Sequence, residues 1–279
     1  MKTTMARQDG VRPWRGVLAT CLVSHLLAAA VEGHDLWVVP GKFALEPGER
    51  FRVFVNSGDE FPTSDSLVGE HRLDRFDLVA ASGRRALEGF AVDGKSLTVE
   101  VTAPEGGIAI LVLAVKPRLI RLKAAEFNEY LKEDGLPHAL RSREERGELE
   151  EPALERYTKC AKAIVRVGDG EDRMWSEPVG TRLEIVPAEN PFALRAGGFL
   201  PLVLLFDGKP LSDVVVSAGR AGGPRNEVSG VTDAEGRVGL VLPISGRWYV
   251  RSIHMIRLEG DPEAEWESFW ATLTFEVQP

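Results

Sequence analysis

Cysteine is scarce in this sequence, and an excess of positive charge is absent. Cys21 and Cys160 are the two cysteines among 279 residues. At most one internal disulfide can form, so no disulfide framework holds the chain together. Lys and Arg number 34 against 42 Asp and Glu, which gives a net charge of −8 at pH 7. A protein that neutralises phosphates needs the opposite sign. We therefore expect neither nucleic acid nor an anionic membrane surface as a partner.

Familiar catalytic motifs are absent from the sequence as well. It contains no Gly-rich phosphate loop opening a helix, no His-Glu-x-x-His zinc motif and no Gly-x-Ser-x-Gly nucleophile elbow. Asp207 and Asp233 both stand in turn sequences, where a carboxylate accepts local backbone hydrogen bonds. Cys160 stands in a strand-like apolar run, which predicts a buried, unreactive thiol. We expect a protein that is not an enzyme.

An apolar run near the N-terminus is short. Residues 17–30 follow a segment with four basic residues and one acidic residue, and this order is typical of a secretory signal peptide. Fourteen helical residues span about 21 Å, less than a hydrocarbon core of about 30 Å, so we expect no stable membrane anchor after cleavage. Cleavage after Ala30 and cleavage after Gly33 both fit the small-residue rule. We assign residues 1–33 to the signal peptide and expect a periplasmic or extracellular protein.

Removal of the signal peptide changes both the charge and the thiol content. Residues 1–33 contain four basic and two acidic residues, so the net charge falls from −8 to −10. Cys21 leaves with this segment, and Cys160 remains as a single thiol. The exported protein therefore has no internal disulfide and is more acidic than the full chain.

Short apolar segments separated by turn sequences make up most of the remaining chain, and they predict antiparallel sandwiches. We expect a mainly β fold with two β-sandwich domains of immunoglobulin or transthyretin-like type, at residues 34–178 and 179–279. Phe127, Tyr130 and Leu131 recur at helical spacing, together with Leu119 and Leu122. This spacing predicts a helical insert at about 118–155 in the first domain. The expected strands are 35–39, 51–56, 76–80, 97–101, 108–115 and 158–168 in the first domain, and 200–206, 214–218, 238–242, 248–255 and 269–277 in the second.

Four histidines follow the predicted signal peptide. His34 becomes the first residue if cleavage follows Gly33, and its α-amine and imidazole then chelate a metal together, an arrangement that suits Ni(II) or Cu(II). The alternative is that His34 simply precedes a strand. His71 lies in a charged loop that can reach a site, although loop exposure is its default. His138 follows Pro137 and is expected to be exposed.

His254 lies in an expected strand near the end of the second domain, where a histidine commonly packs in a core. Strand alternation places Trp248, Val250, Ser252 and His254 on one face and the intervening Tyr249, Arg251, Ile253 and Met255 on the other. This pattern alone does not decide whether His254 binds a ligand.

Several ordered blocks give the chain a resemblance to a known family, and they span nearly all of the mature chain: residues 34–37, 157–168, 179–187, 190–191, 205–211, 232–236 and 266–275. The chain resembles the DUF4198 family, whose members are described as periplasmic proteins related to nickel or cobalt uptake. The resemblance implies a secreted protein that holds a divalent transition metal and passes it towards a membrane importer. It matches His34 to the histidine at the mature start and His254 to the histidine after the late aromatic strand. Cys160 departs from the family pattern.

We therefore predict a metal site with His34, His254 and His71 as ligands, for nickel or cobalt, with copper or zinc as further candidates. One alternative is a non-catalytic carbohydrate- or protein-binding sandwich, because the second domain resembles transthyretin-like modules and five tryptophans remain to offer stacking surfaces. Another is a copper oxidoreductase with an N-terminal histidine brace, which requires a second histidine beside His34.

Overall fold

The computed structural model describes residues 33–169 and 171–279. The predicted signal peptide, apart from Gly33, lies outside the described residues, and so do both cleavage positions before it. Gly33–Pro279 forms one compact unit by its internal contacts. Within the described part of the chain, no helix has the length and apolar character needed to cross a membrane.

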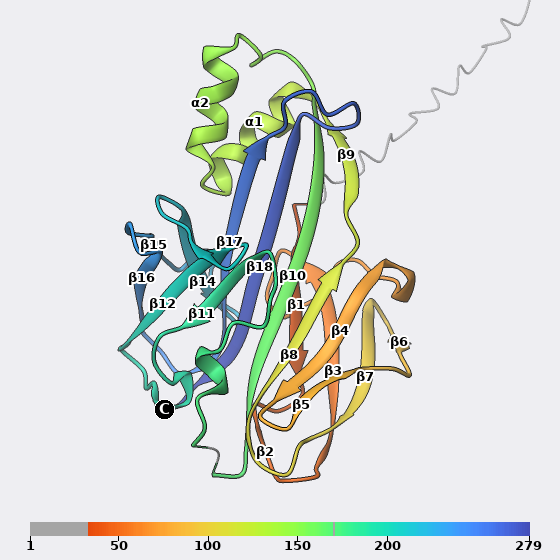
Figure 1. Cartoon of the computed structure of the whole chain (residues 1–279), viewed down its shortest axis with the longest axis vertical. Helices are drawn as coiled ribbons and strands as arrows, with labels where there is room; N and C mark the ends of the chain where they lie inside the picture. The colour runs from red at the N-terminus through yellow and green to blue at the C-terminus, as the bar shows by residue number, and fades with distance from the viewer. Residues whose placement is uncertain (1–32, 170) are drawn as a thin grey trace, which may run out of the picture. The chain divides into compact units, whose positions relative to one another are not determined.

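A ten-stranded sheet runs through both halves of the chain (Figure 1). Strand β10 (Ala153–Val167) pairs in parallel with β18 (Trp266–Val277), with Cys160 opposite Ala271. The sheet is therefore continuous across the domain boundary predicted at residues 178 and 179. That boundary stays a prediction. In spatial order the sheet contains β15 (Val228–Val231), β14 (Val215–Arg220), β17 (Gly246–Arg257), β18 (Trp266–Val277), β10 (Ala153–Val167), β8 (Gly107–Val115), β4 (Leu73–Ala80) and β5 (Gly83–Ala86), while β2 (Ala44–Leu45) and β9 (Arg118–Leu122) also pair with β10.

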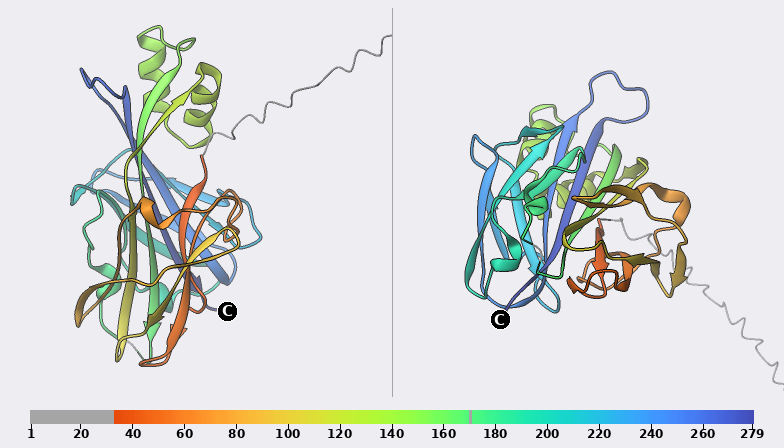
Figure 2. Two further views of the ribbon diagram at one scale, coloured as in Figure 1. Left: turned by 90° about the vertical axis from the view of Figure 1, so that its right-hand side faces the viewer. Right: turned by 60° about the horizontal axis from the view of Figure 1, so that its bottom comes forward.

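Two smaller sheets cover the ten-stranded sheet from opposite sides (Figure 2). The first lies against β10 and β18 through β1 and contains β1 (Asp35–Pro40), β3 (Arg50–Gly58), β7 (Ser96–Thr102) and β6 (Ala91–Asp93). The second lies against β17 and β18 through β11 and contains β11 (Leu183–Pro187), β12 (Gly198–Phe206), β13 (Lys209–Pro210) and β16 (Arg237–Leu242). The prediction of a mainly β, sandwich-type fold is confirmed.

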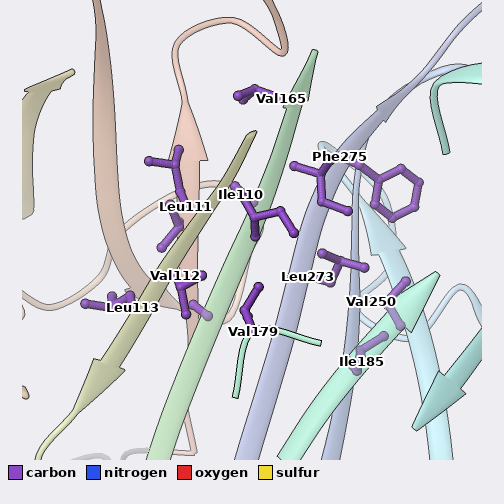
Figure 3. Packing of buried hydrophobic residues seen from close by; sticks show 14 of the residues in the cluster. Ile110, Leu111, Val112, Leu113, Val165, Val179, Ile185, Val250, Leu273 and Phe275 are labelled. Carbon is purple, nitrogen blue, oxygen red and sulfur yellow. The ribbon is translucent and has the colours of Figure 1, made fainter. Parts of the chain in front are cut away.

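Strand β8 shows why the core forms where it does. Its sequence is apolar without alternation, and every residue after Gly107 is buried. A continuous apolar run is typical of a strand covered on both faces. Figure 3 labels Ile110 to Leu113 of β8 together with Leu273 and Phe275 of β18, which belong to the same buried cluster although β10 lies between the two strands. Each fully buried side chain of this kind contributes about 1.5–3 kcal/mol relative to exposure.

The helical insert is confirmed as two helices, α1 (Ala124–Glu133) and α2 (Pro137–Glu145), which lie at one end of the long strands (Figure 1). Phe127, Tyr130 and Leu131 form the buried face of α1 as predicted. The predicted extent of about 118–155 was too wide, because Leu119 and Leu122 belong to β9, which pairs with β10. Three short 3₁₀ helices complete the described elements: η1 (Glu70–Arg72), η2 (Met174–Ser176) and η3 (Pro191–Ala193).

Candidate metal centre

The pairing of β1 with β3 places His34 beside Asp59. In this antiparallel ladder Asp35 lies opposite Gly58. Extending the register by one residue brings His34, which precedes Asp35, next to Asp59, which follows Gly58. The distance from His34 Nε2 to Asp59 Oδ2 is 3.5 Å. Two residues far apart in the sequence therefore meet at the end of one strand pair.

The loop after β3 brings a second carboxylate to the same place. The Asp59 amide donates to Asp65 Oδ2 at 3.1 Å. A Cβ on Gly58 would lie 2.6 Å from both Asp65 Oδ2 and the Thr63 carbonyl oxygen, so this close approach requires glycine. The Asn56 side chain donates to the Pro62 carbonyl at 2.7 Å. These contacts hold the loop in a conformation that directs Asp65 towards Asp59.

His34, Asp59 and Asp65 form a candidate metal site, which we call the His34 site. Among the described residues, it is the group of three or more ligating side chains whose ligand atoms all lie within 4.8 Å of one another. His34 Nδ1 is buried and has no hydrogen-bond partner within the described chain. The His34 side chain is 16% exposed and that of Asp59 is 58% exposed. The His34 side of the site is thus largely buried, and the Asp59 side is open to solvent.

The donor set of the His34 site fits a divalent cation. Two carboxylates supply two negative charges, and an imidazole supplies one nitrogen. Imidazole suits zinc, copper and nickel, whereas carboxylates suit harder cations. Three protein ligands leave room for water or for a further protein donor. The residues present therefore fit a divalent transition metal, and the histidine must be neutral to bind it.

His254 lies on the opposite face of the ten-stranded sheet. Arg251 Nε donates to Asp35 Oδ1 at 2.8 Å, so the Arg251 face of β17 is the one that β1 covers. His254 points the other way and packs edge-on against Phe206, with ring centroids 4.7 Å apart. Burial, reinforced by the nearby His138 and Arg182, lowers the pKa of His254 to about 4. The sheet therefore separates His254 from the His34 site.

Neither His71 nor His138 belongs to the His34 site. His71 is exposed in η1, and its carbonyl accepts from Lys116 Nζ at 2.9 Å. His138 is exposed as predicted, and its Nε2 lies 2.9 Å from the Met255 carbonyl oxygen. Within the described residues, the cluster around His34 contains no second histidine. The histidine brace required by the copper oxidoreductase alternative is therefore not formed there.

Cys160 and the tryptophans, which the sequence offers as a thiol and as stacking surfaces, are buried. The thiol of Cys160 is 8% exposed, and burial raises its pKa to about 11, so the prediction of an unreactive thiol agrees with its environment. All five tryptophans in the described chain are buried: Trp37, Trp175, Trp248, Trp266 and Trp270. They therefore offer no exposed face on which a sugar ring stacks.

One family model matches a segment of the chain that contains all three residues of the candidate site. Residues 31–256 match the family described as a domain of unknown function, DUF4198. The chain belongs to the DUF4198 family. The matched region includes the His34 site and reaches past His254. No curated protein matches this DUF4198 chain.

Solved structures similar to the DUF4198 chain are distant. The D0-D1 domain of intimin is 11% identical, with a TM-score of 0.22 over 88% of this chain and 98% of that one. The Escherichia coli adhesin FdeC is 15% identical, with a TM-score of 0.24 over 88% of this chain and 64% of that one. The fibronectin(III)-like modules of Clostridium thermocellum CbhA are 8% identical, with a TM-score of 0.20 over 86% and 94%. Likenesses this weak carry no functional argument.

Asp59 and Asp65 are absent from the sequence-based prediction, although one signal points to Asp59. The sequence predicts strands at 35–39 and 51–56, which follow one another along the chain. Pairing these two strands antiparallel brings the residues that follow the second strand towards His34, and the observed register, with Asp35 opposite Gly58, places Asp59 there. Asp65 has no comparable signal, because a loop rather than a ladder brings it into place.

Proposed function

We propose that this DUF4198 chain is an exported, non-catalytic protein that binds a divalent transition metal at the His34 site. Nickel or cobalt is the proposed metal, with copper or zinc as further candidates, and a membrane importer is the proposed recipient. The observation that carries the proposal is the convergence of His34, Asp59 and Asp65 within 4.8 Å. His254 and His71, which the sequence predicts as further ligands, are not among the proposed ligands because the cluster does not contain them.

Electrostatics supports the proposed role. Two carboxylates at the site attract a cation directly, and the predicted mature charge of −10 raises the cation concentration around the whole molecule. The exposure of Asp59 leaves a path by which a partner protein can remove the ion. Such an open site suits a protein that transfers its metal better than one that retains it.

The cleavage position decides the number of nitrogen ligands. Cleavage after Ala30 leaves three residues before His34, so the imidazole supplies the nitrogen and the carboxylates supply oxygen. Cleavage after Gly33 creates an α-amine on His34 and adds a second nitrogen, which favours nickel or copper. N-terminal sequencing of the exported protein distinguishes the two forms.

The proposal is tested by calorimetric titration of protein purified after export, with Ni(II), Co(II), Cu(II) and Zn(II) in turn. We expect one metal per chain and a loss of affinity of about tenfold or more in Asp59→Asn and Asp65→Asn, which keep the side-chain shape but remove the charge. The matched control is His71→Ala, which removes an exposed histidine that is not part of the cluster and should leave binding unchanged. Equal binding by wild type and the Asp59→Asn/Asp65→Asn double variant would contradict the proposed site.

A second candidate function is carbohydrate binding, and one exposed aromatic ring favours it. Phe199 on β12 is 59% exposed and lies opposite Val241 of β16, which is 53% exposed. Phe199 extends across Gly239, where a Cβ would meet the ring at 2.0 Å. An exposed aromatic face is a surface on which sugars stack. A glycan array tests this function, with binding that is lost in Phe199→Ala as the supporting result and no bound glycan as the contrary one.

A further inference from the structure

A buried network of four charges lies directly beneath the start of β1. The carboxylate of Asp35 is 1% exposed, and its two oxygens accept from different arginines: Oδ1 from Arg251 Nε at 2.8 Å and Oδ2 from Arg225 Nε at 3.0 Å. Asp134, at the end of α1, pairs with Arg251 Nη2 at 2.9 Å and with Arg225 Nη2 at 3.4 Å. The arginines keep the pKa of Asp35 below its ordinary value despite burial. Two acids and two arginines therefore balance one another inside the protein.

Cationic side chains also hold the backbone on either side of the His34 α-carbon. Arg225 Nη2 donates to the Gly33 carbonyl at 2.9 Å. Lys159 Nζ donates to the His34 carbonyl at 2.5 Å. Lys159 is 7% exposed, and its ammonium lies 4.6 Å from the centroid of the Trp270 ring. These donors come from parts of the chain that are remote from β1 in sequence.

The strand ladder alone does not determine where His34 lies. The β1–β3 register begins at Asp35, so His34 stands one residue beyond the last ladder pair and the ladder does not position it. Its imidazole nevertheless reaches Asp59 across 3.5 Å. The contacts that fix this residue in either processed form are those to the His34 carbonyl and to the Asp35 carboxylate, and cleavage after Ala30 also retains the contact to the Gly33 carbonyl.

We infer that Lys159, Arg225 and Arg251 are positioning residues of the His34 site. By holding the His34 carbonyl and the Asp35 carboxylate, and also the Gly33 carbonyl when cleavage follows Ala30, they direct the imidazole of His34 towards Asp59 and Asp65. None of the three touches the proposed ion, since a cation repels them. This inference rests on the proposed metal-binding function, and it assigns to the buried network a role beyond the stability of the fold.

The inference is tested with two variants and a matched control. Lys159→Met removes the ammonium but retains most of the stem, and Arg225→Gln removes a guanidinium that is 25% exposed and therefore tolerates change better than Arg251. The control is Arg257→Gln, which breaks an ion pair of β17 with Glu148 at the helical end of that strand. Nickel affinity is measured by calorimetry and fold stability by urea unfolding, each on protein shown to be folded by circular dichroism.

We expect Lys159→Met and Arg225→Gln to weaken nickel binding by about 10- to 100-fold, the usual effect of removing a group that orients a metal ligand. The absorption spectrum of the cobalt-loaded protein should also change, because the ligand geometry changes. Lys159→Arg, which retains a donor to the His34 carbonyl, should restore most of the affinity. Arg257→Gln should lower stability and leave nickel affinity and the cobalt spectrum unchanged.

The two proposals fail in different ways. Wild-type affinity and cobalt spectrum retained in folded Lys159→Met and Arg225→Gln would overturn the positioning role and leave the proposed function intact. An equal loss of affinity in Arg257→Gln would also overturn it, because a general effect of stability would then explain the results. Absence of metal binding by the wild type would overturn the proposed function, and the positioning role with it. If Lys159→Met does not fold, Arg225→Gln alone decides the outcome.

Discussion

The buried ion pair between Lys162 and Glu184 offers the most direct test of how the halves of the chain are joined. Lys162 is on β10 and Glu184 is on β11, and Nζ lies 2.8 Å from Oε1, with the side chains 5% and 2% exposed. Glu184 also accepts from the amides of Val179, Gly180 and Thr181. Burial lowers the pKa of Lys162. Despite burial, Lys162 and the amides of Val179 and Gly180 keep the pKa of Glu184 below its ordinary value.

The two partners should differ in what their removal costs. Glu184→Gln leaves a buried ammonium without its counter-charge, and breaking such a pair costs about 3–5 kcal/mol. In Lys162→Met the carboxylate retains three backbone donors and the methionine fills the vacated space, so we expect a smaller loss of about 2 kcal/mol. The double variant contains neither charge. We expect it to be no less stable than Glu184→Gln alone, which corresponds to a coupling of about 2 kcal/mol.

Urea unfolding of the four proteins at pH 7 measures this coupling, with circular dichroism and tryptophan fluorescence as separate probes. Coincident transitions from the two probes are needed before the free energies are compared. Losses that simply add, within about 0.5 kcal/mol, would refute the reasoning, because independent sites behave in that way.

Three further predictions concern other buried or crowded groups. Burial raises the pKa of Glu155 from its ordinary value of 4.5 to about 7, so the folded state holds a proton that the unfolded state has released. Stability should therefore fall by up to roughly 3 kcal/mol as the pH rises from about 4.5 to 7, and urea unfolding of Glu155→Gln should show a flatter profile over this range. Gly58→Ala places a methyl group 2.6 Å from Asp65 Oδ2 and should displace that carboxylate, lowering nickel affinity in calorimetry while the chain stays folded. Cys160, which is buried with a pKa of about 11, should react with a thiol reagent at pH 8 at least about 100-fold more slowly in folded than in urea-unfolded protein, and equal rates would contradict its burial.

Local patterns predict the secondary structure of this chain well where a single element determines the pattern. Phe127, Tyr130 and Leu131 mark the buried face of α1 because an isolated helix fixes their spacing. Leu119 and Leu122 show similar spacing but lie in β9. Their conformation depends on pairing with β10, a partner more than thirty residues away that the local sequence does not contain.

The candidate site depends on contacts between distant segments, and the sequence predicts it in part. His34 is identified from its place after the predicted signal peptide and from the family blocks. Strand alternation correctly separates His254 from Arg251, but alternation does not show which face of β17 meets β1. The structure answers this through the pairing of Arg251 with Asp35. The choice of residues by their chemistry alone therefore predicts a site with three histidine ligands. The strand pairing and the loop after β3 instead bring one histidine together with two aspartates.

The ligand set of the bound metal is the central claim, and X-ray absorption spectroscopy of the nickel-loaded exported protein tests it most directly. The proposed site predicts a first shell dominated by oxygen and nitrogen, with the scattering of one imidazole and no sulfur. Processing after Gly33 adds one amine nitrogen and leaves the imidazole count at one. Two or three imidazoles in the first shell, or a sulfur ligand, would contradict a site made of His34, Asp59 and Asp65.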